Sequence, residues 1–243
     1  MNSMIRTILT LIYVSLSFVV LFPFGLIAMF FYFLGLKKIM TYAIYKLAQG
    51  WALSIIIVTG CTVKVTGKEN VPKKGGVCFV ANHTGFFDIV LIFASCGRPV
   101  GFIAKKELSY IPFLNCWIYM VGGQFIDRSS ARKALRSINK GVERIKSGGG
   151  MIIFPEGHRS KGRGLLPFHP GSLKLATMAN APIVPAVLEG SYNVFEKNYR
   201  VNSTELKVTF CEPIDTASLS PEDRKVVLSD RIYSVINERL SKG

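Results

Sequence analysis

The sequence predicts an α/β fold class, with a mostly parallel central sheet flanked by helices and an N-terminal hydrophobic helical membrane anchor. From residue 61 onward, short apolar runs that suit buried strands alternate with longer segments that carry helical start and stop signals. Between Arg6 and Lys37, by contrast, there is not one charged residue. We therefore divide the chain into a membrane-associated part, residues 1–59, and an α/β domain, residues 60–243.

The N-terminal apolar run is longer than the roughly 20 residues that a helix needs to cross a bilayer. Pro23 breaks or kinks a helix in the middle of this run. Basic residues flank the run on both sides, so positive charge sets no orientation. A bent helical hairpin that enters and leaves on one side of the membrane satisfies both observations, and one or two spans or a buried helix are the alternatives. Residues 37–58 mix Lys, Tyr and Trp with apolar residues, as interfacial helices do.

The composition limits the partners of this chain. There are 30 Lys and Arg against 15 Asp and Glu, which gives a net charge of +15. Such a surface favours anionic partners, namely phospholipid headgroups, phosphorylated substrates or acidic proteins. The sequence contains no aromatic–basic RNA motif and no zinc-finger spacing, so no nucleic-acid partner is expected. The five cysteines are widely spaced within apolar runs, which predicts reduced core residues.

The elements of the α/β domain follow in order from periodicity and from turn residues. The expected strands are residues 62–67, 77–81, 100–104, 122–126, 151–154, 182–188 and 205–213. The expected helices are residues 88–96, 129–147, 171–180 and 220–240. Serine caps the helix 129–147, and a run of three glycines follows it. The last helix is expected to begin at a Ser220 cap, with Pro221 at its first position and Asp223 three residues on.

Polar residues follow four of these strands, each just past the carboxyl end. They are His83 and Asp88, then Lys105 and Glu107, then Asp127 and Arg128, and finally the run Glu156, Gly157, His158 and Arg159. In open α/β sheets, ligands bind in the crevice outside the carboxyl ends of the strands. If the four strands are parallel neighbours, these groups meet over one cleft.

His83 and Asp88 form a candidate acid–base pair. A spacing of five separates them by about 140° on one helix, so they do not share a helical face. With His83 in a loop and Asp88 in the first turn of the next helix, the carboxylate reaches one imidazole nitrogen and fixes the tautomer. The alternative is that Asp88 only complements the helix N-terminus. A metal site of His83, His158 and His169 lacks a helical ligand pair and is not expected.

The sequence shows no nucleophile for His83 to activate. There is no G-x-S-x-G elbow, and no cysteine stands in a comparable loop after a strand. The attacking group therefore belongs to the substrate, most simply a hydroxyl. Lys105, Arg128 and Arg159 supply positive charge for a phosphate on the substrate or donor, and Gly157 permits close backbone approach.

Four ordered motifs carry a resemblance to a known family. "NHTGFFD" resembles the N-H-x-S-x-x-D motif of the glycerolipid acyltransferases, and "GGQFIDR" resembles their second motif. "FPEGHRS" resembles their third motif, F-P-E-G-T-R-S, and "IVPAVL" their fourth. The match covers about residues 60–190. By size and layout the chain is most similar to the bacterial 1-acyl-sn-glycerol-3-phosphate (lysophosphatidic acid) acyltransferases.

The resemblance implies a reaction. A fatty acyl group passes from an acyl thioester, either acyl-ACP or acyl-CoA, to the sn-2 hydroxyl of lysophosphatidic acid, and phosphatidic acid forms for phospholipid biosynthesis. His83 is then the general base and Asp88 its orienting partner, and no metal or bound cofactor is expected. The implied location is the cytoplasmic face of the cell inner membrane, against an anionic membrane surface.

The resemblance also assigns the substrate-binding residues. Lys105, Arg128 and Arg159 are expected to hold the acceptor phosphate, with Glu156 and Gly157 positioning the glycerol. We expect the oxyanion donors to be backbone amides at the start of the helix that carries the motif aspartate.

Three positions depart from the family pattern, namely Gly85 for serine, Gln124 for an apolar residue and His158 for threonine. They leave another lysophospholipid or a lyso-aminolipid open as acceptor. A membrane lipid-binding scaffold is the non-enzyme alternative, and a fatty-acid-releasing hydrolase is disfavoured by the missing elbow.

Overall fold

A computed structural model describes residues 3–127, 129–169, 171–216, 219–220, 222 and 227–242. Seven strands form one sheet in the order β1-β7-β6-β2-β5-β3-β4. They are β1 Thr62–Thr66, β2 Val77–Ala81, β3 Val100–Lys105, β4 Gln124–Ile126, β5 Gly150–Ile153, β6 Ile183–Glu189 and β7 Glu205–Phe210. All neighbours pair in parallel except β6 and β7. The predicted mostly parallel sheet is therefore confirmed.

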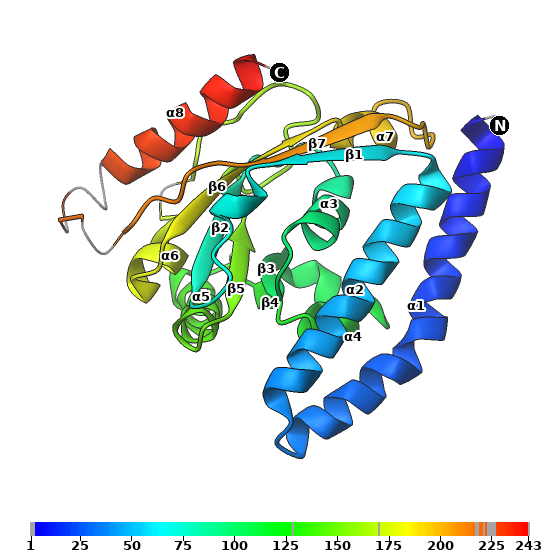
Figure 1. The fold of residues 1–243 in the computed structure, drawn as a ribbon, viewed down its shortest axis with the longest axis horizontal. Coiled ribbons are helices and arrows are strands. Elements are labelled where there is room, and N and C mark those ends of the chain that lie inside the picture. Colours follow the sequence, from blue (N-terminus) through cyan, green and yellow to red (C-terminus); the bar gives the residue numbers. More distant parts are fainter. Residues whose placement is uncertain are drawn as a thin grey trace.

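Helices cover both faces of this sheet (Figure 1). They are α1 Ser3–Phe33, α2 Lys37–Thr59, α3 Phe87–Ser95, α4 Leu114–Met120, α5 Ala131–Lys146, α6 Lys174–Ala179, α7 Ser191–Val194 and α8 Val227–Ser241. Two short 3₁₀ turns, η1 Lys68–Asn70 and η2 Lys106–Tyr110, complete the described elements. Helices α2 and α3 pack on one face, and α5, α6 and α8 pack on the other. Two layers of helix thus enclose the sheet, as the alternation of strands and helices predicted.

The central strand β2 is buried on both faces because it lies between helices. Phe79 packs into the core under α2 and α3, whereas Cys78 and Val80 pack into the core under α5, α6 and α8. A continuous apolar run suits such a strand better than polar alternation does. None of the five cysteines is paired, and all but Cys116 are buried, which confirms their predicted place in the core.

The two predicted helix starts have different outcomes. At α5 the hydroxyl of Ser130 accepts a hydrogen bond from the Lys133 backbone N–H at 3.3 Å, as expected of a serine cap. The described α8 begins only at Val227, and Ser220 lies outside it. Pro221 and Asp223, which were expected in its first turn, lie outside the described residues.

The N-terminal hairpin is built differently from the prediction. Helix α1 continues through Pro23 and bends along its length without breaking (Figure 1). The chain reverses at residues 34–36, so the predicted interfacial helix is the second arm of the hairpin. The Trp51 indole donates a hydrogen bond to the Ser17 hydroxyl at 2.8 Å and ties the two arms together. A proline kink removes one helical hydrogen bond, which neighbouring turns and the second arm offset.

Both arms are long and apolar enough to cross a membrane by length and composition. Large apolar side chains of α1 lie exposed along the helix, among them Val20 and Phe33. The start of α1 is held against the α/β domain, because the Thr7 hydroxyl accepts a hydrogen bond from the Val201 backbone N–H at 2.7 Å. Both ends of the hairpin therefore meet the same domain, and its apolar surface is left for a membrane.

Candidate active site

The four polar clusters predicted at strand ends lie along one edge of the sheet. The strands that precede them, β2, β5, β3 and β4, are consecutive parallel neighbours in that order. Their carboxyl ends therefore point the same way, with adjacent strands about 4.8 Å apart. The cleft position expected from the sequence follows from this topology.

His83 and Asp88 make the contact that the sequence predicted. His83 leaves β2 in a loop, and Asp88 lies in the first turn of α3. The imidazole Nδ1 lies 2.7 Å from Asp88 Oδ2, and the aspartate side chain is fully buried. The same Oδ2 accepts backbone N–H groups from Thr84 at 2.7 Å and Gly85 at 2.9 Å.

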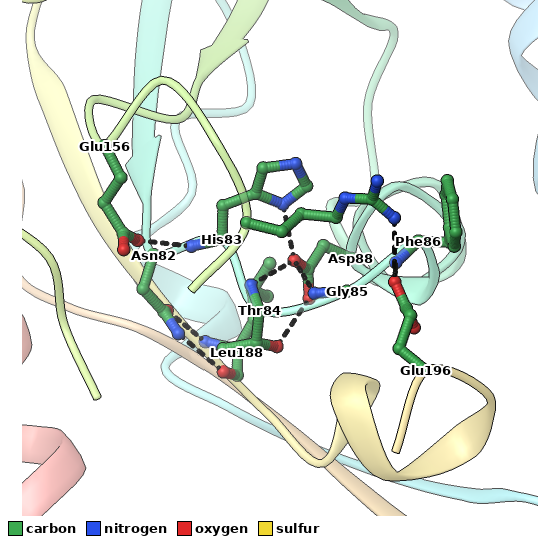
Figure 2. A network of polar contacts seen from close by, with 10 residues as sticks. Asn82, His83, Thr84, Gly85, Phe86, Asp88, Glu156, Leu188 and Glu196 are labelled. Carbon is green, nitrogen blue, oxygen red and sulfur yellow. Dashed lines mark hydrogen bonds and ion pairs between the residues drawn. The ribbon is translucent and has the colours of Figure 1, made fainter. Parts of the chain in front are cut away.

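These contacts determine the tautomer of His83. A carboxylate oxygen only accepts hydrogen bonds, so Nδ1 donates to Asp88 Oδ2 beside the two backbone N–H groups, and in the neutral ring the lone pair is then on Nε2. Figure 2 shows the second ring nitrogen pointing away from Asp88. The ring stacks on Phe154 with centroids 4.1 Å apart. A neutral imidazole held on two sides presents a basic nitrogen at the edge of the sheet.

Four backbone amides around the start of α3, where the oxyanion donors were expected, already have acceptors inside the protein. The amides of Thr84 and Gly85 bind Asp88, and the Phe86 amide donates to Glu196 at 2.7 Å. The amide of Asp88 itself donates to the Gly85 carbonyl. Three of these N–H groups bind buried carboxylates and one binds a carbonyl, so these four do not face a substrate in this structure.

Glu156 holds the loop that carries His83. Its Oε1 accepts the His83 backbone N–H at 2.6 Å, and its Oε2 accepts the Leu166 backbone N–H at 3.0 Å. The residue is 1% exposed. Both oxygens face backbone donors inside the protein, so Glu156 holds the loop of His83 in place. The contact between Glu156 and the glycerol that the resemblance implied stays a prediction.

We expect Glu156→Gln to show its role through pH. Burial raises the pKa of Glu156 above its usual range, although the N–H groups of His83 and Leu166 oppose the shift. Because the pKa of Glu156 is raised in the folded state, its contribution to the free energy of unfolding falls as the pH rises above the ordinary glutamate pKa of about 4.3. The amide variant loses roughly 1–3 kcal/mol by facing a backbone donor with an NH₂ group. The difference in the free energy of unfolding between wild type and Glu156→Gln should therefore shrink as the pH rises above about 4.3.

Urea unfolding of both proteins between pH 4 and pH 7 measures this difference. Glu205→Gln, an exposed change on β7, is the matched control and should show no such trend. A Glu156→Gln deficit that grew with pH would contradict the assignment.

Sequence reasoning missed three structural partners of the site. Asn82 is buried. Its side-chain NH₂ donates to the Leu188 carbonyl and its side-chain oxygen accepts the Leu188 N–H, at 2.8 Å each, which joins the end of β2 to β6 (Figure 2). Phe154 stacks on His83, and Glu196 binds the start of α3. Asn82 stands within the first motif and was open to recognition. Glu196 follows α7 in a segment without pattern, and no signal pointed to it.

Arg159 is a predicted binding residue that contacts Phe86, in the loop between His83 and α3. Its guanidinium Nη1 lies 3.0 Å from Glu196 Oε1, and its Cζ lies 3.7 Å from the centre of the Phe86 ring. The side chain is 29% exposed, so part of the guanidinium still faces solvent. Within the described residues this ion pair is its one hydrogen bond, which leaves N–H donors for a ligand.

The other predicted binding residues either follow the carboxyl ends of the strands or fall outside the described residues. Lys105 is exposed at the end of β3 and pairs with Glu107 at 3.5 Å. Gly157 adopts a left-handed conformation with φ 74°, which glycine accommodates without strain, and its predicted approach to the substrate stays a prediction. Arg128 lies outside the described residues. Asp127 directly precedes it in the chain. Hydrogen bonds from Ser129 and the ion pair with Lys106 hold the pKa of Asp127 below its usual range.

The described residues contain no group of three His, Cys, Asp or Glu side chains arranged to hold a metal ion. The rings of His158 and His169 lie 6.5 Å apart, whereas His83 is engaged with Asp88. The imidazole of His83 has no hydrogen-bond partner besides Asp88 in the described part of the chain.

The α/β domain thus carries a His–Asp pair at the carboxyl ends of its strands, and among the described residues no serine, threonine or cysteine side chain is bonded to the imidazole. Residues 62–189 match the family described as Acyltransferase. This chain belongs to the acyltransferase family and is an O-acyltransferase.

Named relatives support the same conclusion. The chain is 32% identical over 186 residues to the 1-acyl-sn-glycerol-3-phosphate acyltransferase of Borreliella burgdorferi, covering 76% of this chain and 72% of that one. It is 29% identical over 184 residues to the enzyme of that name from Escherichia coli, covering 75% and 74%. The fold matches the crystal structure of the 1-acyl-sn-glycerophosphate acyltransferase PlsC from Thermotoga maritima. The TM-score is 0.79 at 26% identity, covering 98% and 96% of the two chains.

Proposed function

We propose that this enzyme transfers a fatty acyl group from an acyl thioester to the sn-2 hydroxyl of 1-acyl-sn-glycerol 3-phosphate, forming phosphatidic acid. One observation carries the proposal: Asp88 holds Nδ1 of His83, and the second ring nitrogen, Nε2, points away from Asp88. A base placed in this way suits a hydroxyl supplied by the substrate. The names of the relatives from Borreliella burgdorferi and Escherichia coli support this acceptor.

The reaction follows from this geometry. The acceptor hydroxyl attacks the thioester carbonyl carbon while His83 Nε2 takes the hydroxyl proton, and a tetrahedral intermediate forms. Asp88 stabilises the resulting imidazolium through Nδ1–H. The carbon–sulfur bond then breaks, and the imidazolium returns the proton to the departing thiolate. General-base catalysis contributes about 10²–10⁴-fold, so positioning of acceptor and donor supplies the rest.

Arg159 is the first candidate for the acceptor phosphate, with Lys105 and Arg128 as further cations. A guanidinium offers paired N–H donors in a fork that matches phosphate oxygens. Arg159 is already held in place by Glu196 and Phe86, so little side-chain freedom is lost when the phosphate binds.

We expect Arg159→Ala to raise the KM for lysophosphatidate roughly tenfold or more, because a charged hydrogen bond is worth about 1.5–3 kcal/mol. The KM for the acyl thioester should stay within twofold. Lys64→Ala, which removes one exposed positive charge from β1, is the matched control. Steady-state kinetics with each substrate varied in turn measures both KM values. A rise only in the KM for the thioester would show that Arg159 binds the donor and not the acceptor phosphate.

An apolar cavity supports the binding of an acyl chain. It lies between α1, α2, α3, β3 and α4, and its wall includes Ala48, Phe93 and Trp117. Ile89 also lines it and follows Asp88 directly in the chain. A methylene chain gains about 0.8 kcal/mol for each CH₂ that it buries. We propose that this cavity receives the acyl chain beside the reaction centre.

Ala48→Phe should shift the acyl preference toward shorter chains. Ala48 is a buried residue of α2 at the cavity wall, so a phenyl group there takes up space from the chain. Each methylene excluded should cost about fourfold in kcat/KM, from about 0.8 kcal/mol per CH₂. Ala43 lies exposed on the same helix, so Ala43→Phe is the control and should leave the chain-length preference unchanged. A series of acyl thioesters tests both variants, and equal profiles would refute the cavity assignment.

We propose that the α1–α2 hairpin lies along one leaflet at the cytoplasmic face of the cell inner membrane. Lys37 and Lys38 stand at the start of α2, next to the turn between the two arms. Insertion turn-first would place them deep in hydrocarbon, at about 2.5–3.5 kcal/mol each. Lying flat leaves the lysines at the headgroups and buries the exposed apolar face of α1. Protease protection showing the two chain termini on opposite sides would exclude this arrangement.

The full-length enzyme in membranes, given lysophosphatidate and a labelled acyl thioester, tests the proposed reaction. Labelled phosphatidate is the expected product, with acyl-ACP and acyl-CoA run in parallel to identify the donor. Free fatty acid would indicate a hydrolase, and no turnover would indicate a lipid-binding scaffold. Gln124 and His158 depart from the family pattern, so other lysolipids belong in the same assay.

A further inference from the structure

Glu196 is a buried carboxylate at the motif loop that neither the reaction nor the sequence motifs account for. It lies after α7 and is 8% exposed. Its Oε1 accepts the Phe86 backbone N–H at 2.7 Å and pairs with Arg159 Nη1 at 3.0 Å (Figure 2). Its Oε2 is buried and has no hydrogen-bond partner among the described residues. An unpaired buried carboxylate oxygen destabilises a fold, so stability does not explain this residue.

Phe86, Glu196 and Arg159 form a closed unit. The backbone of Phe86 fixes the carboxylate, the carboxylate holds one edge of the guanidinium, and the Phe86 ring supports the guanidinium face at 3.7 Å. Arginine has five N–H donors and several rotatable bonds. Two fixed contacts restrict the guanidinium, and its remaining N–H donors have no hydrogen-bond partner among the described residues.

Gly85 provides the space for this carboxylate. A Cβ at Gly85 would lie 2.9 Å from Glu196 Oε2 and 3.1 Å from the Ser191 carbonyl group. Real Cβ contacts below 3.0 Å essentially do not occur. Gly85 does not have a positive φ, so its lack of a side chain matters and its backbone freedom does not. The family motif usually has serine here, and in this chain the carboxylate of Glu196 occupies that place.

We propose that Glu196 is a positioning residue for the acceptor phosphate, that it acts through Arg159, and that Gly85 is its required partner. This inference rests on the proposed function of Arg159. A guanidinium that is already ordered loses less freedom on binding phosphate, which is the general basis of preorganisation. The negative charge of Glu196 by itself would repel a phosphate. The two effects have opposite signs, so the direction of the change in KM separates them.

Steady-state kinetics of the full-length enzyme tests the proposal. Glu196→Ala should raise the KM for lysophosphatidate about 3- to 10-fold, as expected from freeing one ordered side chain. Its kcat and its KM for the thioester should stay within twofold. Glu196→Gln keeps an oxygen for Phe86 and Arg159 and should restore most of the affinity. Glu205→Ala, which removes an exposed carboxylate on β7, is the control.

Three results would overturn the inference. A lower or unchanged KM in Glu196→Ala would show a simple repulsive charge or no role. A fall in kcat with the KM unchanged would show a structural effect on the His83 loop. Equal losses in the Ala and Gln variants, together with a lower Tm, would show a role in folding only.

Double variants separate this inference from the function on which it rests. In an Arg159→Ala background, Glu196→Ala should add less than twofold, because both changes remove one unit. If Arg159→Ala alone leaves the KM unchanged, the phosphate role fails. If Arg159→Ala raises the KM and Glu196→Ala does not, only the positioning role fails.

Gly85→Ser should displace Glu196 and raise the KM as Glu196→Ala does. The double variant Gly85→Ser/Glu196→Ala should be no worse than either single variant. Multiplicative losses would show that the two residues act independently. If Gly85→Ser does not fold, recovery of folding in the double variant supports the shared space, and failure of both refutes it.

Discussion

His83→Ala should abolish acyl transfer while the protein stays folded and membrane-bound. Without the imidazole no group takes the proton from the attacking hydroxyl, and kcat should fall by about 10²–10⁴-fold. The ring makes one hydrogen bond and one stacking contact. Asp88 keeps its two backbone donors from Thr84 and Gly85 when the ring is gone. The fold should therefore lose no more than about 1–3 kcal/mol.

Phosphatidate formation by purified membranes measures this loss, with thermal unfolding as the check on the fold. His169→Ala is the matched control, because His169 is an exposed histidine without an assigned role in the reaction. We expect the control to retain wild-type turnover. Substantial activity in His83→Ala would refute the assignment of the general base.

Asp88→Asn should reduce kcat by about 10²-fold or more, with little change in either KM. The amide keeps the shape of the side chain and an oxygen for the amides of Thr84 and Gly85. It removes the negative charge 2.7 Å from Nδ1 that stabilises the imidazolium of His83. An asparagine NH₂ turned toward the ring would also favour the wrong tautomer.

The split between kcat and KM distinguishes catalysis from folding in this variant. Asp230→Asn changes an exposed carboxylate of α8 and should behave as wild type. If Asp88 only complemented the N-terminus of α3, its asparagine variant would lose stability and keep its kcat. That outcome would restore the structural interpretation of the His–Asp spacing.

Much of the fold was predictable because local patterns were strong. The short apolar runs at residues 77–81 and 183–188 lie between turn residues, and both form strands of the buried sheet. The segment at residues 106–120, which forms η2 and α4, escaped prediction because it is short and lacks a cap pattern. Pro23 predicted a break or a kink in the first helix, and that helix bends but continues through it, packed against a second long helix.

The active site was predictable to a different degree for each residue. His83 and Asp88 lie five residues apart, so a loop and one helical turn suffice to bring them together. Glu156 was recognised as part of the site, but its hold on the His83 loop was not predicted, because the sequence does not show which oxygen meets which backbone donor. Glu196 lies 110 residues after Phe86 in the chain, and no local signal connects them.

The sequence by itself determined the α/β class, the apolar N-terminus and the His–Asp pair, because each depends on residues close together in the chain. Only the tertiary structure decided which groups surround that pair. The order of strands sets Glu156 under His83, and the loop after β6 sets Glu196 against Gly85. Such contacts depend on which distant segments become neighbours and on the space between them. Neither can be predicted from the spacing of residues close together in the chain.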